Sequence, residues 1–184
     1  MDAYLVVYVI LVLVYRIAEV LVMARIGTAA KKPRRDWTAW LTIVPYWLVL
    51  VGPALEYLAR DYLSPRTPAL VLGSALFLAA IAVRIRAHLD LGKQFTTFLA
   101  EGKERGLVTT GLYGYIRHPL YLADLLLFLA CPSFLAVNWS WILTAIGFVG
   151  MVLRIEMEER ALRQTFEAYS AYSERTWKLI PQIY

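Results

Sequence analysis

The sequence predicts an all-α protein, a polytopic membrane helical bundle of about five transmembrane helices. Three observations lead to this prediction. First, 60% of the 184 residues are hydrophobic, whereas a soluble domain is about half apolar. Second, the mean hydropathy is +0.56. Third, the apolar residues fall in stretches of roughly 20, the length that an α-helix needs to cross a bilayer. We interpret residues 1–184 as one integral membrane domain.

The first two spans are long apolar runs that end in charged segments. The first is expected at about residues 3–26. It lacks the basic start and the small-residue cleavage site of a signal peptide, so we expect it to be retained. The second is expected at about 37–59, after a basic cluster in which Pro33 discourages helix. Asp36 is the predicted N-cap of the second span.

The third and fourth spans begin at prolines, which suit the first position of a helix. The third is expected at about 68–89, with Thr67 as its cap. The fourth is expected at about 120–137, after Pro119, with Pro132 bending or ending it. The third span ends in three basic side chains that we expect to snorkel to the lipid headgroups, with a position of His88 facing the loop as the alternative: Arg84, Arg86 and His88.

The fifth span is expected at about 139–156, with Asn138 as its cap. Beyond Arg154 the pattern turns charged, but apolar residues continue at spacings of seven, four and three, which fit one helical face: Ile155, Leu162, Phe166 and Tyr169. We therefore predict one continuous helix to about Tyr169, which leaves the bilayer near Arg154.

The distribution of lysine and arginine predicts how the chain is oriented in the membrane. With five spans, three basic segments lie on one side, and only Arg60 and Arg66 lie on the other. The three segments contain Lys31, Lys32, Arg34 and Arg35; Lys93, Lys103, Arg105 and Arg117; and Arg160, Arg163, Arg175 and Lys178. The basic side should be cytoplasmic, which places the N-terminus outside and the C-terminus inside. The net charge of +5 then indicates membrane lipids rather than nucleic acid as partners.

Two further features limit the kinds of site that the chain can hold. Cys131 is the only cysteine, which excludes an intrachain disulfide and a cysteine-based metal cluster, and we expect no metal site. Arg16 and Glu19 lie three residues apart inside the first span and can pair on one helical face. We interpret them as a structural ion pair, with a wall of a substrate path as the alternative.

The segment between the third and fourth spans is the first candidate for chemistry. Residues 90–118 hold five of the ten glycines, which permit positive φ and close backbone approach. The segment ends in Arg117 and His118, directly before the helix start that Pro119 sets. A helix N-terminus offers unpaired N–H groups and a positive dipole end, so this position suits a carboxylate.

The second candidate is the charged cluster at the end of the fifth span. Arg154 and Glu158 are four residues apart and share a helical face. Glu159 lies roughly 100° further round the helix. Ionisable residues at a membrane boundary are costly to bury and are candidate functional groups.

These two clusters resemble one known family of enzymes. Two runs between the third and fourth spans are similar to the cofactor-binding signature of isoprenylcysteine carboxyl methyltransferases: Leu107-Val108-Thr109-Thr110-Gly111-Leu112-Tyr113 and Arg117-His118-Pro119-Leu120-Tyr121. A further element of the family pattern resembles Leu91-Gly92-Lys93-Gln94-Phe95. The C-terminal signature of the family resembles Arg154-Ile155-x-x-Glu158-Glu159-x-x-Leu162, followed by Phe166, Tyr169, Tyr172 and Ile180-Pro181. The resemblance covers about residues 91–181. Leu112 and Ala123 depart from it, where many members have proline and glycine.

The resemblance implies a five-helix core that binds S-adenosylmethionine from the cytoplasm, with a lipophilic substrate entering from the bilayer. Arg154 would hold the substrate carboxylate, because a guanidinium offers a bidentate fork and keeps its proton. His118 and the helix start at Pro119 would hold the methionine carboxylate of the cofactor, and Glu158 or Glu159 its ammonium or ribose hydroxyls. The other implied cofactor contacts are Gln94, Leu107, Val108, Tyr113, Arg117 and Tyr121.

Three other functions stay open from the sequence. One is a membrane methyltransferase that acts on a small thiol or a phospholipid amine, neither of which needs a guanidinium such as that of Arg154. Another is an NADPH-dependent membrane reductase. The third is a haem-binding or purely structural membrane protein, since His88 and His118 flank the long loop.

Overall fold

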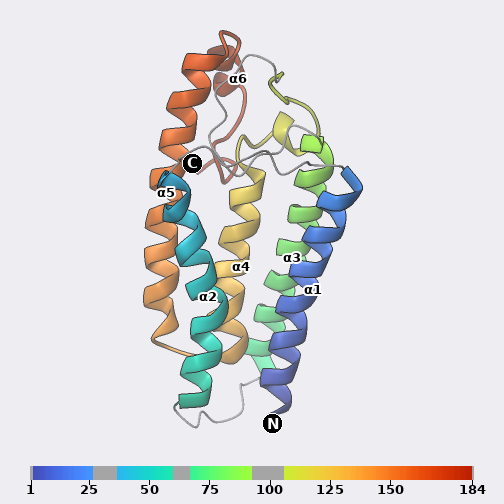
Figure 1. Cartoon of the computed structure of the whole chain (residues 1–184), viewed down its shortest axis with the longest axis vertical. Coiled ribbons are helices and arrows are strands. Elements are labelled where there is room, and N and C mark those ends of the chain that lie inside the picture. The colour runs from blue at the N-terminus through green and yellow to red at the C-terminus, as the bar shows by residue number, and fades with distance from the viewer. Residues whose placement is uncertain (1, 27–36, 60–66, 93–105, 184) are drawn as a thin grey trace.

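The computed structural model describes residues 2–26, 37–59, 67–92 and 106–183, which form an elongated bundle of helices (Figure 1). The long helices run side by side along its axis. They are α1 (Ala3–Ile26), α2 (Trp40–Ala59), α3 (Thr67–Leu91), α4 (Pro119–Leu135) and α5 (Ser140–Thr165). Three short helices complete the described chain: η1 (Trp37–Ala39), η3 (Gly111–Gly114) and α6 (Tyr169–Glu174). The fold is therefore the predicted all-helical bundle.

Length and composition make the bundle suited to a membrane. α1, α2, α3 and α5 are long and apolar enough to cross one, and α4 is a shorter apolar helix of 17 residues. Large apolar side chains, such as Leu21, Leu58 and Val149, are exposed on the outside of the bundle. An apolar exterior of this kind is expected where lipid, rather than water, surrounds a bundle. α4 occupies the centre and packs against the other four long helices.

Close helix contacts in the core depend on small residues. A Cβ added to Gly73 of α3 would lie 2.7 Å from the backbone nitrogen of Phe134 in α4. Only glycine fits there, because small residues let two helix backbones approach each other in a membrane. Around this contact the rings of Tyr8, Phe77 and Phe134 pack with centroids 6.0–6.2 Å apart. This contact fixes α3 against α4.

The start of α5 differs from the prediction. The helix begins at Ser140, and its N-terminus is capped by Glu56 of α2 rather than by Asn138. Glu56 accepts hydrogen bonds from the backbone nitrogens of Asn138, Trp139 and Ser140 at 3.0, 2.7 and 2.6 Å. A carboxylate satisfies several unpaired N–H groups at once and suits the positive end of the helix dipole. Local sequence does not reveal a cap that comes from another helix.

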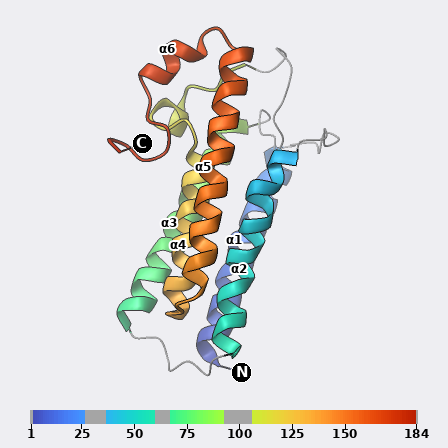
Figure 2. The ribbon, with the colours of Figure 1, turned by 90° about the vertical axis from the view of Figure 1, so that its left-hand side faces the viewer.

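The end of α5 also differs. The predicted continuous helix to Tyr169 is wrong, since α5 ends at Thr165 and α6 begins at Tyr169. Phe166 takes an extended conformation, with φ −120° and ψ 113°. The break lets the tail fold back towards the bundle, as Figure 2 shows. There the Arg117 nitrogen donates to the Trp177 carbonyl at 2.8 Å, and the Trp177 nitrogen donates to the Tyr115 carbonyl at 2.9 Å.

The other predicted boundaries agree closely with the helices. α4 begins at Pro119 with His118 as its N-cap, and Pro132 lies in its last turn. α3 begins at Thr67, one residue before the predicted start. The predicted cap Asp36 lies outside the described residues.

Candidate functional site

Arg117 joins the loop before α4 to the tail after α5. Its Nε donates to Glu159 Oε1 at 2.7 Å, and its Nη1 donates to the carbonyl oxygens of Ser173, at 2.8 Å, and Thr176. The guanidinium is buried. A buried cation of this kind is retained only where carboxylate and carbonyl oxygens surround it, as they do here. Arg117 therefore holds three segments of the chain together.

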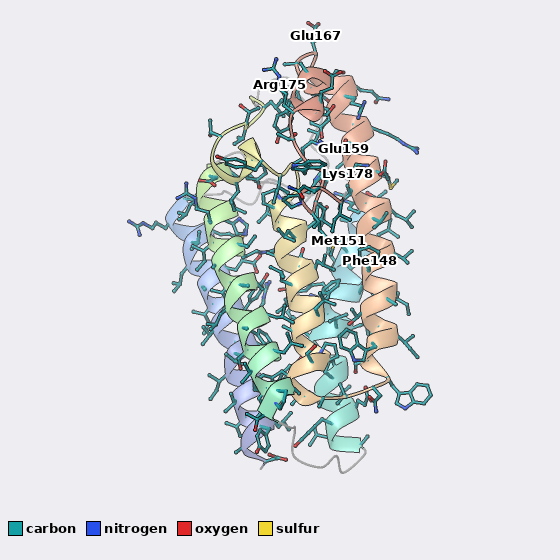
Figure 3. All side chains as sticks on the ribbon, turned by 180° about the vertical axis from the view of Figure 1, so that it is seen from behind. Phe148, Met151, Glu159, Glu167, Arg175 and Lys178 are labelled. Carbon is teal, nitrogen blue, oxygen red and sulfur yellow. The ribbon has the colours of Figure 1, made fainter. Side chains whose placement is uncertain are left out.

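Glu159 accepts hydrogen bonds from several of the residues that meet around Arg117. Its Oε1 also lies 3.0 Å from His118 Nε2, and it accepts from the Tyr169 hydroxyl at 2.9 Å. Burial, together with the negative charge of Glu159, raises the pKa of Tyr169 above its usual range, so its hydroxyl stays protonated and donates. Figure 3 shows Glu159 at the level where Lys178 of the tail passes α5. Lys178 Nζ lies 2.6 Å from Glu156 and ties the tail to the same helix.

Glu158 has a different environment from its neighbour. It accepts from the Tyr121 hydroxyl at 2.8 Å, and its Oε1 lies 3.4 Å from Arg154 Nε. Its side chain is 23% exposed, against 4% for Glu159. The sequence did not separate the two glutamates, but the structure places only Glu158 on the wall of a cavity.

Arg154 is buried beside this cavity. Its side chain is 1% exposed, and its Nη1 donates to the Thr38 hydroxyl in η1, directly before α2. It also interacts with the Tyr121 hydroxyl. Arg154 is not among the described residues that line the cavity, but its neighbours Tyr121 and Glu158 are. The guanidinium thus lies one side chain away from the cavity.

The cavity has a volume of about 470 Å³, within the range of small-molecule sites. One end lies under the tail, and the other reaches Phe128, Gly147 and Met151 inside the bundle. Seven of the predicted site residues line it: Leu107, Val108, Tyr113, Arg117, His118, Tyr121 and Glu158. Pro119 is buried and sets the start of α4, Arg154 and Glu159 support the wall as described, and Gln94 lies outside the described residues.

The inner wall of the cavity holds four charged residues, of which the sequence analysis named Arg16 and Glu19 as an ion pair or a wall of a substrate path, and did not name Arg84 and Asp124 as part of the site. They come from α1, α3 and α4: Arg16, Glu19, Arg84 and Asp124. The expectation that Arg84 and His88 snorkel is wrong, because Arg84 is only 12% exposed and His88 is buried. The sequence did contain a signal for these residues, because charged residues within apolar spans are candidates for a functional site. The predicted pair of Arg16 and Glu19 is confirmed, whereas the partners of Arg84 were not apparent because Glu19 and Asp124 lie on other helices.

Comparison with known proteins gives one match. A model of the isoprenylcysteine carboxyl methyltransferase (ICMT) family matches residues 71–164. This range is just over half of the chain, and it contains most of α3, all of α4 and nearly all of α5. It also contains His118, Arg154, Glu158 and Glu159. No curated protein matches the chain at a significant level.

Proposed function

The chain belongs to the isoprenylcysteine carboxyl methyltransferase family, and from this membership we propose that it methylates the carboxylate of an isoprenylcysteine-like amphiphile with S-adenosylmethionine. The main support is the lining of the cavity, which combines polar side chains under the tail with apolar and charged side chains inside the bundle. A water-soluble cofactor and a lipophilic acceptor need a site of this kind if they are to meet.

The residues of the polar chamber suit the cofactor. His118 and the unpaired N–H groups of the first turn of α4 would hold its methionine carboxylate. Glu158 has a carboxylate on the cavity wall for the ammonium or the ribose hydroxyls. Leu107, Val108 and Tyr113 offer apolar and aromatic surface for the adenine ring. The chamber thus contains a partner for each part of this ligand.

The acceptor carboxylate needs positioning more than activation. Bound S-adenosylmethionine supplies an electrophilic methyl group on a sulfonium. A carboxylate is already ionised at neutral pH, so the protein has to exclude water and align the oxygen, which can contribute several kcal/mol. Arg154 is the proposed orienting group. Its access to the cavity requires Glu158 to move aside, and the positive charge of the cofactor would draw Glu158 away from it.

The first test is binding of S-adenosylhomocysteine to the purified full chain, measured by calorimetry, with NADPH as the control. The proposal expects micromolar binding of the adenosyl ligand and none of NADPH. Methylation is then assayed with a farnesylcysteine analogue, a small thiol and phosphatidylethanolamine. Lack of adenosyl binding by folded protein would reject the proposal, and NADPH binding would favour a reductase. Methylation of only the thiol or the amine would replace the proposed acceptor.

A further inference from the structure

Two large aromatic side chains are exposed where the tail pairs with the loop before α4. Trp177 is 46% exposed and Tyr115 is 71% exposed. They belong to one short backbone bridge, in which the Trp177 nitrogen donates to the Tyr115 carbonyl and Trp177 is paired with Ile116 in parallel. We call Tyr115 and Trp177 the aromatic pair. Neither is among the residues that line the cavity, so the proposed reaction gives no reason for their exposure.

The contacts of the tail place the aromatic pair at the boundary of the membrane-spanning part of the bundle. The His118 nitrogen donates to the Lys178 carbonyl at 3.2 Å, directly before the start of α4 at Pro119. Lys178 Nζ lies 2.6 Å from Glu156 of α5. Leu153, which is 50% exposed on the apolar exterior of the same helix, lies three residues earlier, about 4.5 Å along the helix axis. The tail therefore passes where the apolar exterior gives way to charged residues.

The end of the tail projects from the side of the bundle. In Figure 2 the C-terminal segment extends sideways past the start of α4, whereas α6 lies further from the apolar part of the bundle. Figure 3 shows Lys178 nearer than Arg175 to Met151 in the apolar part of α5. A segment at this height and position has lipid headgroups, rather than other helices, next to it. Tryptophan and tyrosine favour this layer, because their rings are apolar and also carry a polar group.

The same tail closes the end of the cavity beneath it, which we call the binding chamber. Arg117 donates to the carbonyl oxygens of Ser173 and Thr176, and the Tyr172 hydroxyl donates to the Tyr113 carbonyl at 2.7 Å. Arg117, Tyr113 and Tyr172 line the cavity. A contact that holds the tail in this position therefore stabilises the closed chamber, and a ligand enclosed by the chamber does the same.

We propose that the aromatic pair anchors the tail in the headgroup layer of the surrounding membrane, and that this anchor favours the closed binding chamber. The link to the cofactor rests on the proposed function. Phospholipid is the partner, because the pair continues the lipid-facing exterior of the bundle at its boundary. Since lipid contact and cofactor both favour the same position of the tail, each should strengthen the binding of the other.

The depth of the tail in the membrane can be measured without any ligand. A nitroxide label is attached to Trp177→Cys in the full chain, in nanodiscs of phosphatidylcholine and phosphatidylglycerol, with Glu167→Cys as the control. Glu167 is exposed and lies at the far end of the protein in Figure 3, and Cys131 is buried, so it should stay unlabelled. We expect the label at position 177 to collide more often with oxygen, which concentrates in lipid, and less often with a water-soluble nickel complex.

Two results of this measurement would overturn the anchor. One is equal accessibility of the labels at positions 177 and 167, which would place the tail in water. The other is dipolar broadening of the label at position 177, because a second copy of the chain would then cover this surface.

Calorimetry with S-adenosylhomocysteine in the same nanodiscs tests the effect on the binding chamber. Trp177→Ser removes the ring but keeps the backbone bridge, and it should weaken binding about fivefold, at the lower end of typical coupling between two sites. Trp177→Tyr should keep most of the affinity. Trp139→Ser is the matched control, because Trp139 is 56% exposed at the start of α5, at the other end of the bundle. This control should leave the affinity unchanged.

The outcomes separate the anchor from the proposed function. Wild-type affinity in Trp177→Ser would overturn the link between the anchor and the chamber, as would an equal loss of affinity in Trp139→Ser. If the label at position 177 reports lipid but the wild-type protein does not bind S-adenosylhomocysteine, the proposed function fails while the anchor is supported. Tyr115→Ser, which should also weaken binding, is the second variant if Trp177→Ser does not fold.

Discussion

At the scale of single residues, the site separates groups that hold the fold from groups that face a ligand. Glu159 accepts from Arg117, His118 and Tyr169 with a single oxygen and is nearly excluded from the cavity. Glu158 makes fewer bonds and lines the cavity. The adjacent residues Glu158 and Glu159 therefore have different roles, and loss of each carboxylate should have a different effect on binding and on stability.

Substitution of each glutamate by glutamine should separate these roles. Glu158→Gln should weaken binding of S-adenosylhomocysteine about tenfold or more, because a bond to a charged group is lost, with little change in thermal stability. Glu159→Gln should lower the melting temperature, because it removes the negative charge that faces Arg117 and His118. Calorimetry and thermal unfolding measure the two effects. The assignment is wrong if Glu159→Gln is as stable as the wild type and binds weakly.

Arg154→Lys tests the proposed orienting group. A lysine keeps the charge but cannot form a bidentate pair, so kcat should fall roughly a hundredfold. Affinity for S-adenosylhomocysteine should change far less. Arg160→Lys, an exposed position on the same helix, is the control and should keep full activity. Near-normal turnover by Arg154→Lys would exclude this role for Arg154.

At the scale of elements, the helices depend on partners that are distant in the sequence. Glu56 of α2 caps α5, and Arg84 of α3 pairs with Glu19, 65 residues earlier. The apolar runs and prolines predicted the positions of the helices well, because both signals are local. The cap of α5, the break at Phe166 and the partners of Arg84 were not predictable, because each depends on contacts with another element.

Removal of the Glu56 cap should destabilise the bundle. Glu56→Ala leaves three backbone N–H groups of the α5 start without their acceptor, and loss of a helix cap costs roughly 0.5–2 kcal/mol. Thermal unfolding in detergent should show a lower melting temperature, with unchanged affinity for S-adenosylhomocysteine. Glu56→Asp, which can still accept, should lose less stability. Equal stability of all three proteins would contradict the capping role.

At the scale of the whole molecule, the two ends of the bundle have different chemistry. The N-terminus lies at the end opposite α6 and the tail (Figure 1), and the orientation with this tail end in the cytoplasm stays a prediction. Seven of the site residues that the family resemblance implied line one cavity, and their roles stay predictions. The sequence did not place Arg84 and Asp124 at the cavity, because no local pattern links residues on separate helices.

Labelling of introduced cysteines tests the orientation. Cys131 is buried, so it should give little background. A membrane-impermeant maleimide applied to intact cells should label Ala3→Cys and should label Ile183→Cys only after the cells are opened. Both positions are exposed in the structure, so their accessibility depends on the membrane alone. The reverse pattern would place the cavity on the outer side.

The folded-back tail sets an order of events during synthesis. Arg117 takes its acceptors from Ser173 and Thr176, which the ribosome adds long after α4. All the long helices can therefore enter the membrane before the binding chamber exists. A nascent chain that stops before residue 173 would be inserted yet unable to close the chamber, so a truncated product should not sequester cofactor.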